Sequence, residues 1–234
     1  MKHRKISYSK YFFAALLAFL VFFLGLSLGV ILTNERLMWL EVESRQQQVD
    51  YQSLQFQQLY LLTLENNSDI CLVLDKALEN SLKDLSISLD RFVNYNSQGK
   101  IKKAEFELVG RKYMIDNLRY FLTVEKSKMI CNLDIVTVLY FFSEKDCPSC
   151  PNQGVVLTYF KKLFEDRLLI FPINIDFSEL EPSIDMVRTR YNVTSLPTLV
   201  IAENKYDGIL SREELGNIIC AQFKNQDDKC KKFK

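Results

Sequence analysis

Residues 135–150 read IVTVLYFFSEKDCPSC. The first eight are β-branched or large apolar residues, a composition that favours a buried β-strand. A polar loop follows, and beyond Cys150 the apolar residues recur at helical spacing. The segment therefore predicts a strand, a loop that carries Cys147, and a helix that begins near Cys150.

Two thiols at this spacing after a strand can alternate between a dithiol and a disulfide. The unpaired N–H groups and the macrodipole of a helix N-terminus stabilise a thiolate there. We therefore expect Cys147 to be the nucleophile and Cys150, one turn further in, to attack the mixed disulfide and release the partner. Pro148 and Ser149 would form the active-site loop between them.

The chain has 234 residues, enough for one sizeable core and a smaller region. Its 30 basic and 29 acidic residues nearly balance, and no basic stripe is interleaved with aromatic residues. Nothing in the charge pattern favours a nucleic-acid partner.

Residues 11–32 form an uncharged, apolar run that, as a helix, would extend about 33 Å and cross the bilayer core. The tail before it is basic, with Lys2, Arg4, Lys5 and Lys10. The positive-inside rule then predicts a single-pass membrane protein with residues 1–10 in the cytoplasm and the rest extracytoplasmic.

Two further interpretations of this run remain open. Ser27-Leu28-Gly29 offers small residues for signal-peptide cleavage, although the run is longer than an ordinary signal-peptide core. Gly25 and Gly29 form a small-xxx-small face that would let two membrane helices pack closely, so a homodimer through this face is possible.

All six cysteines would then lie outside the cytoplasm, and an even count suits an oxidising compartment. With Cys147 and Cys150 as the redox pair, the other four allow three connectivities. Proximity in sequence favours structural disulfides Cys71–Cys131 and Cys220–Cys230. The alternative is that these four are free thiols that pack as small apolar side chains.

Residues 33–130 contain two glycines, Gly99 and Gly110, no proline, and leucines at three- and four-residue steps. This predicts three helices, to about 65, from about 70 to 95 and from about 101 to 125. Val42, Val49 and Phe56 recur every seven residues, a weak coiled-coil pattern. The region carries no catalytic pattern, and we expect a stalk or docking scaffold.

From residue 133 onward the periodicity changes. Strands are predicted at 133–142, 168–175 and 198–202, with helices at 150–165, 178–190 and 211–223. Such alternation is typical of an α/β domain with one sheet, here 131–234 with its C-terminal tail.

Cys147–Cys150, together with YNVTSLPTLVI at 191–201, resembles the thioredoxin superfamily. In the second segment Pro197 precedes an apolar strand, as the family's cis-proline does. DGILSREEL at 207–215 resembles the family's glycine and the start of its final helix. The resemblance covers about 131–223 and does not extend to the helical region.

The resemblance implies a four-stranded mixed sheet flanked by helices, with Pro197 facing the redox pair. A cis bond at Pro197 would turn the Leu196 backbone outward, so that Ser195, Leu196 and Pro197 line a groove for extended client segments. The alternative is an ordinary trans proline that enters a strand.

The chain also departs from the family. Asp146 stands where thioredoxins carry tryptophan, and Tyr140 or Phe141 stands where they carry a buried acid. Glu144, Lys145 and Asp146 are candidates for the missing proton relay, or are simply a solvated loop. The only histidine is His3, so the thiolate-stabilising histidine of strongly oxidising relatives is absent. A C-P-x-C pair is more similar to glutaredoxins, and the direction of electron flow stays open.

We therefore expect a membrane-anchored thiol–disulfide oxidoreductase that acts on client proteins and is reset by a membrane redox partner, such as a quinone-linked oxidase or an electron-delivering transporter. No cofactor and no metal is expected, because the cysteines fit zinc spacing poorly. The alternative is a non-catalytic adaptor in which Cys147–Cys150 is a structural disulfide.

Overall fold

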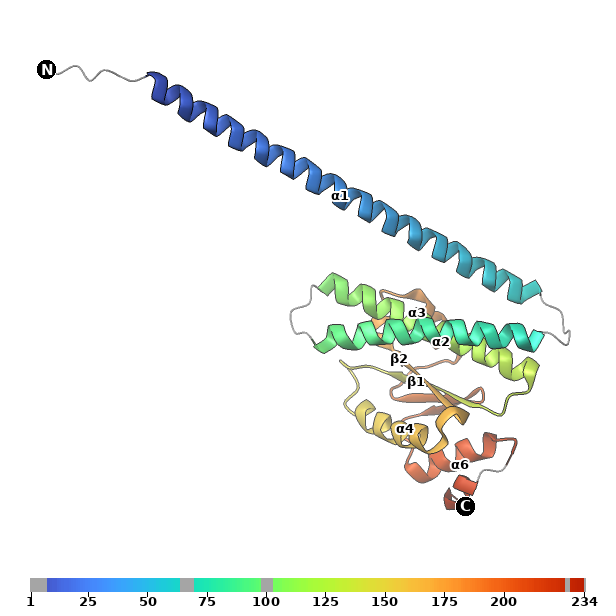
Figure 1. Ribbon diagram of the computed structural model, residues 1–234. Helices are drawn as coiled ribbons and strands as arrows, with labels where there is room; N and C mark the ends of the chain where they lie inside the picture. Colours follow the sequence, from blue (N-terminus) through green and yellow to red (C-terminus); the bar gives the residue numbers. More distant parts are fainter. Residues whose placement is uncertain (1–7, 64–69, 98–102, 226–227, 234) are drawn as a thin grey trace. The chain divides into compact units, whose positions relative to one another are not determined.

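The structure, a computed structural model, describes residues 8–63, 70–97, 103–225 and 228–233. The chain divides into two compact units, Met1–Leu64 and Glu65–Lys234. The first contains helix α1, Tyr8–Thr63, blue in Figure 1. Within the described ranges one segment, Phe12–Gly29 of α1, is long and apolar enough to cross a membrane, and its large apolar side chains are exposed.

The second unit combines helices and strands. Its elements are α2 (Ile70–Ser97), α3 (Lys103–Cys131), β1 (Val136–Phe142), α4 (Cys150–Phe164), β2 (Leu168–Asn174), α5 (Pro182–Arg190), β3 (Thr198–Ile201), β4 (Asn204–Asp207) and α6 (Arg212–Gln222). Short 3-10 helices are η1 (Glu165–Arg167), η2 (Ile175–Phe177) and η3 (Asp228–Phe233).

The strands form one mixed sheet in the order β2-β1-β3-β4. β1 runs parallel to β2 and antiparallel to β3, and β3 runs antiparallel to β4. Val138 of β1 pairs with Ile170 on one side and Ile201 on the other. The parallel pair needs a crossover, which α4 supplies.

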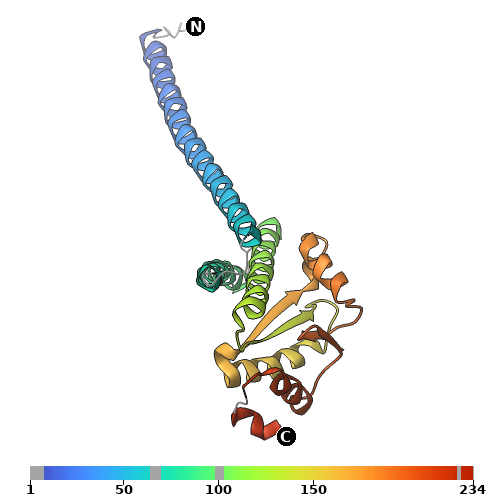
Figure 2. The ribbon, with the colours of Figure 1, turned by 90° about the vertical axis from the view of Figure 1, so that its right-hand side faces the viewer.

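Side chains of β1 alternate between two cores, as the period of a strand requires. Val138 and Tyr140 belong to the core that α4 and α6 cover, whereas Leu139 and Phe141 belong to the core that α3 and α5 cover. Figure 1 shows β1 and β2 between α3 and α4, and Figure 2 shows the same arrangement from the side. This sheet order with helices on both faces is the thioredoxin-like fold, so the predicted fold class is confirmed, behind an all-α region and an apolar N-terminal helix.

α2 packs along α3 (Figure 1). The two helices are antiparallel, since the Cys71–Cys131 disulfide joins the start of α2 to the end of α3. Tyr95 near the end of α2 donates to Glu105 near the start of α3, at 2.6 Å. α3 itself lies on the sheet, with Leu118 and Phe121 in the same core as Phe141, which the sequence analysis did not predict.

Two predicted boundaries shift for local reasons. The helix expected to end near residue 125 continues to Cys131, where Asn132, at φ 56°, takes up the left-handed conformation that commonly ends helices. The helix expected at 178–190 begins at Pro182, because η2 occupies the preceding turn and the Glu181 side chain caps the helix by accepting the Ser183 N–H.

Candidate redox site

The predicted redox pair, Cys147 and Cys150, lies between the end of β1 and the start of α4. Cys147 and Cys150 are joined by a disulfide with their Cα atoms 5.4 Å apart, and α4 begins at Cys150 with Pro151 in its first turn. Cys147 is 6% exposed and Cys150 2%, and both belong to the core under α4 and α6. Pro148 between them is exposed. Cys147 is therefore the cysteine nearer the surface, and Cys150 is the inner one.

The loop before Cys147 is held by one carboxylate. Asp176 of η2 accepts the Ser143 hydroxyl at 2.6 Å and the N–H groups of Glu144 and Lys145 at 3.0 and 3.3 Å. Ser143 Oγ in turn accepts the N–H groups of Lys145 and Asp146, at 3.1 and 2.8 Å. The sequence analysis missed Asp176, although the carboxyl ends of neighbouring parallel strands meet at one sheet edge, which was a usable signal.

Tyr140 supports the inner cysteine. Its hydroxyl donates to the Cys150 carbonyl oxygen at 2.6 Å, and burial raises the pKa of Tyr140 to about 12. Of the two residues expected at the family's acid position, Tyr140 faces α4 and the disulfide, whereas Phe141 faces α3. At the position where an acid was expected, the side chain that faces the disulfide is thus the neutral phenol of Tyr140, which donates to a backbone carbonyl.

The Ser149 hydroxyl lies beside the outer cysteine, with its Oγ 3.7 Å from Cys147 Sγ. Glu144, Lys145 and Asp146, named as candidates for a proton relay, are exposed. A relay through them stays a prediction.

The loop before β3 lies at the same sheet edge as the disulfide, because Thr198 pairs with Phe141 near the end of β1. Its Leu196–Pro197 peptide bond is cis. Leu196 packs against both cores and Pro197 is buried, with its carbonyl accepting the Gly208 N–H at 2.8 Å. Ser195 is exposed.

Asp207 ties this loop to β4. It accepts the Ser195 hydroxyl at 3.0 Å and lies 2.9 Å from the Thr198 hydroxyl. The Lys205 ammonium, 2.8 Å away, is the main cause that lowers the pKa of the Asp207 carboxyl, and the two hydroxyls act in the same direction. The charged carboxylate therefore fixes the loop before β3.

The other four cysteines pair within the second unit. Cys71 is joined to Cys131, and Cys220 of α6 to Cys230 of η3. Cys220 and Cys230 thus bond each other instead of joining the redox pair in a four-cysteine cluster. Across the described ranges, no group of three or more His, Cys, Asp or Glu side chains is arranged to hold a metal.

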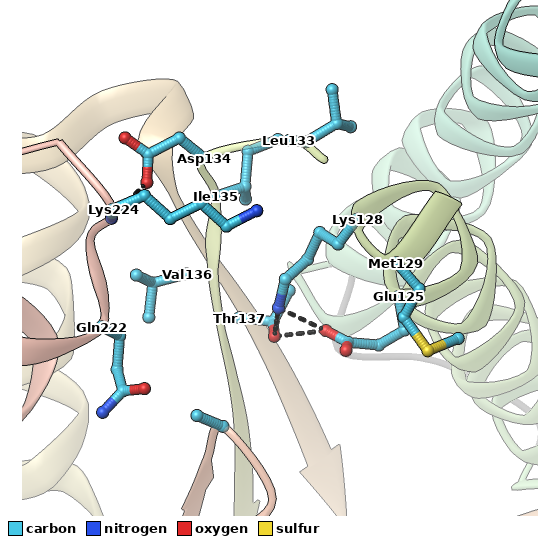
Figure 3. Close-up of a pocket in the computed structure, with 11 residues that line it drawn as sticks. Glu125, Lys128, Met129, Leu133, Asp134, Ile135, Val136, Thr137, Gln222 and Lys224 are labelled. Carbon is cyan, nitrogen blue, oxygen red and sulfur yellow. Dashed lines mark hydrogen bonds and ion pairs between the residues drawn. The ribbon is translucent and has the colours of Figure 1, made fainter. Parts of the chain in front are cut away.

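A hollow of about 270 Å³ opens at the other end of β1, beside Val136 and Thr137 (Figure 3). The Lys128 ammonium lies 2.9 Å from the Glu125 carboxylate and 2.8 Å from the Thr137 hydroxyl, which itself donates to Glu125. These polar groups satisfy one another, and the hollow lies away from the disulfide, so we assign it no part in the redox site.

No protein-family model and no curated protein matches the chain. Solved structures similar to it include chloroplastic thioredoxin z, at 18% identity and TM-score 0.33 over 42% of this chain and 88% of that one. The thioredoxin Deadhead of Drosophila melanogaster is 19% identical, with a TM-score of 0.33 over 43% of this chain and 92% of that one. A malarial protein is 26% identical, with a TM-score of 0.32 over 38% of this chain and 97% of that one. The fold assignment rests on the sheet order and helix placement described above.

Proposed function

We propose that the chain is a membrane-anchored, extracytoplasmic thiol–disulfide oxidoreductase that exchanges disulfides with extended protein segments through Cys147 and Cys150. One observation supports this most: a disulfide-bonded pair at the start of α4 shares a sheet edge with the Ser195–Pro197 loop. Kinship with the thioredoxin superfamily is part of this proposal.

The roles follow from the order of the two cysteines, with Cys147 in the loop before α4 and Cys150 at the first residue of the helix. Once the pair is reduced, the Cys147 thiolate gains from the helix N-terminus and from the Ser149 hydroxyl beside it. It attacks a client disulfide, forms a mixed disulfide and releases the first client thiolate. The Cys150 thiolate then attacks Cys147 Sγ, the bond to the client breaks, and the client leaves fully reduced. The oxidised pair runs the same steps in reverse.

The Ser195–Pro197 loop is suited to hold the client. Within residues 103–225, no hydrogen bond of the structure uses the N–H or C=O of Leu196. Such free backbone groups can pair with an extended segment in the manner of an added strand. We propose that this contact aligns a client sulfur with Cys147.

Net oxidation or reduction of clients requires a partner that resets the site, because each such turnover leaves the pair in the opposite redox state. We propose that this partner is a membrane redox protein with its own dithiol or disulfide. It would act on the extracytoplasmic side, because the basic tail before residue 11 favours a cytoplasmic N-terminus. Labelling of introduced surface cysteines in intact cells with a membrane-impermeant maleimide tests this sidedness. Labelling only after permeabilisation would contradict it.

The first test is the reduction potential of the Cys147–Cys150 pair in the full chain in detergent micelles, against glutathione buffers. A value above about −220 mV supports an oxidase or isomerase, and one near −270 mV supports a reductant. A pair that stays oxidised below about −300 mV contradicts exchange and favours the adaptor, in which the disulfide is structural.

Trapping provides the second test. Cys150→Ala removes the resolving thiol, so mixed disulfides between Cys147 and clients should accumulate and disappear on reduction. The matched control is the double variant with Cys147→Ala as well, which cannot form them. Equal amounts of adduct in both would contradict the proposal.

A further inference from the structure

Gln153 is a fully buried polar residue one turn after Cys150 on α4. Its Oε1 accepts the Leu210 N–H at 2.8 Å, while its Nε2 makes no hydrogen bond to any described residue. The Leu210 donor fixes the orientation of the amide, since only the carbonyl oxygen can accept. An unpaired buried N–H group costs about 1–3 kcal/mol, so its presence calls for an explanation.

The position of Gln153 relates it to the inner cysteine. Residues three apart lie on the same face of a helix, and Cys150, Gln153 and Leu157 are all buried there. Long helical side chains lean towards the helix N-terminus, which for Gln153 is the turn that holds Cys150. Two other described residues have an unpaired buried side-chain atom, Arg111 on α3 and Ser178 at the end of η2, and neither lies on the helix that carries Cys150.

We infer that Gln153 Nε2 donates a hydrogen bond to the Cys150 thiolate once the disulfide opens, which makes Gln153 a positioning residue for the resolving step. This inference rests on the proposed function. In the disulfide the Cys150 sulfur is uncharged and a weak acceptor, and the Gln153 amide makes no hydrogen bond to it. A thiolate is charged, and hydrogen bonds to charged groups are about twice as strong.

The step balances without a further reactant. The Cys150 thiol gives its proton to water, and its thiolate attacks Cys147 Sγ of the mixed disulfide. The bond between Cys147 and the client sulfur breaks, and the client leaves as a thiolate that takes up a proton. Gln153 lowers the energy of the attacking thiolate and undergoes no chemical change.

The other surroundings of Cys150 offer its sulfur little compensation. From β1, the Tyr140 hydroxyl donates to the Cys150 carbonyl, not the sulfur. From α6 and the loop before it the core residues are apolar, and Glu214 is exposed and paired with Ser211. The charged residues of the preceding loop, all exposed, are Glu144, Lys145 and Asp146. A buried thiolate in apolar surroundings has a raised pKa unless a donor stabilises it.

The test uses Gln153→Met, which keeps the length of the side chain and removes the amide. Both Gln153→Met and its parent carry Cys147→Ser, so that Cys150 is the single thiol while the other two disulfides stay oxidised. Absorbance at 240 nm then follows the ionisation of Cys150 in the full chain in micelles. We expect Gln153→Met to raise the pKa of Cys150 by about one unit or more. Resolution of a mixed disulfide at neutral pH should slow about threefold, because the tenfold smaller thiolate fraction is partly offset by the greater nucleophilicity of the less acidic thiol.

Asn117→Leu is the matched control. Asn117 is a buried amide that donates to the Pro172 carbonyl at 2.9 Å on the other face of the sheet. Its loss should reduce stability and leave the pKa of Cys150 unchanged. An equal pKa of Cys150 in the Gln153→Met variant and its parent would overturn the inference.

A second measurement needs no variant at this position. The side-chain amide protons of Gln153 should shift on reduction of the wild-type full chain, and again as Cys150 ionises, in NMR spectra of the micelle-bound protein. Identical amide shifts in both redox states would also overturn the inference. A wild-type pair that cannot be reduced refutes the proposed function instead, so the two failures are distinguishable.

Discussion

Asp176→Ala should loosen the loop that presents Cys147. The Ser143 hydroxyl donates to Asp176 at 2.6 Å. Ser143 is only 2% exposed, so solvent cannot replace this hydrogen bond. Glu144 and Lys145, which also donate to Asp176, are exposed, so their N–H groups can bind solvent. One buried hydroxyl left unpaired costs about 1–3 kcal/mol, and the exposed bonds add less. We expect the free energy of unfolding to fall by about 2 kcal/mol.

A loss of that size lowers the midpoint of thermal unfolding by about 4–8 °C in a unit of this length. Circular dichroism of the full chain in micelles measures it. The rate at which fixed glutathione reduces the Cys147–Cys150 disulfide should rise, because the loop shields Cys147. Asp90→Ala, an exposed carboxylate on α2, is the control and should change stability by less than about 0.5 kcal/mol. If Asp176→Ala matched it in both measurements, the loop would not depend on this carboxylate.

Three further changes test the fold. Joint replacement of Cys71 and Cys131 by Ala opens a 60-residue loop, and loop-closure entropy predicts a loss of about 4 kcal/mol in urea unfolding under non-reducing conditions. Burial raises the pKa of Tyr140 to about 12, so its contribution to stability is complete below the unfolded-state pKa near 10 and is lost as the pH rises through about 12. Tyr140→Phe should flatten the decline of the thermal midpoint over that range. Gly216→Ala would place a Cβ 2.6 Å from Phe233 Cγ and should cost about 1–3 kcal/mol, whereas an unchanged urea midpoint would contradict the packing of η3 on α6.

Three of the four strands were predictable because β1, β2 and β3 are short, mainly apolar runs, whereas β4, Asn204–Asp207, is polar. β1 is an unbroken run of β-branched, aromatic and leucine residues, typical of a strand covered on both faces. The landmarks at Cys147, Pro197 and Gly208 then selected one topology among those that α/β alternation allows. A single apolar run with helical spacing carries no comparable information about its partners.

α3 illustrates that limit. Its apolar residues, such as Leu118 and Phe121, show that one face is buried but do not say against what. Only the structure shows that this face lies on the sheet and that α2 lies on α3. The domain boundary predicted at residue 131 therefore stays a prediction. The core shows that α3, the last helix before that residue, forms one of the layers that cover the sheet.

The site divides in the same way. The two cysteines and the Ser195–Pro197 loop were found from local motifs, because their chemistry is written in adjacent residues. Asp176 lies 33 residues from Ser143 in sequence. Its role depends on two parallel strands ending side by side, which the predicted topology implies but no run of adjacent residues encodes. Gln153 was hidden for another reason: a lone polar residue on a helix is usually solvated, and only burial reveals it as exceptional.

The placement of buried acids bears on how the proposed exchange handles its proton. Among the described residues, the buried carboxyl groups are those of Asp116 and Glu181. Both are paired with basic side chains, Asp116 with Lys112 at 2.6 Å and Glu181 with Arg111 at 3.5 Å. Asp116 lies on α3 and Glu181 caps α5, the two helices on the face of the sheet opposite α4. In the proposed exchange the Cys150 proton therefore passes to water or to the departing client instead of to a buried carboxylate. The donor that we infer for the Cys150 thiolate, the Gln153 amide, is neutral, and a neutral dipole stabilises a thiolate at every pH at which the protein folds, so this contribution to the resolving step does not depend on the titration of the donor.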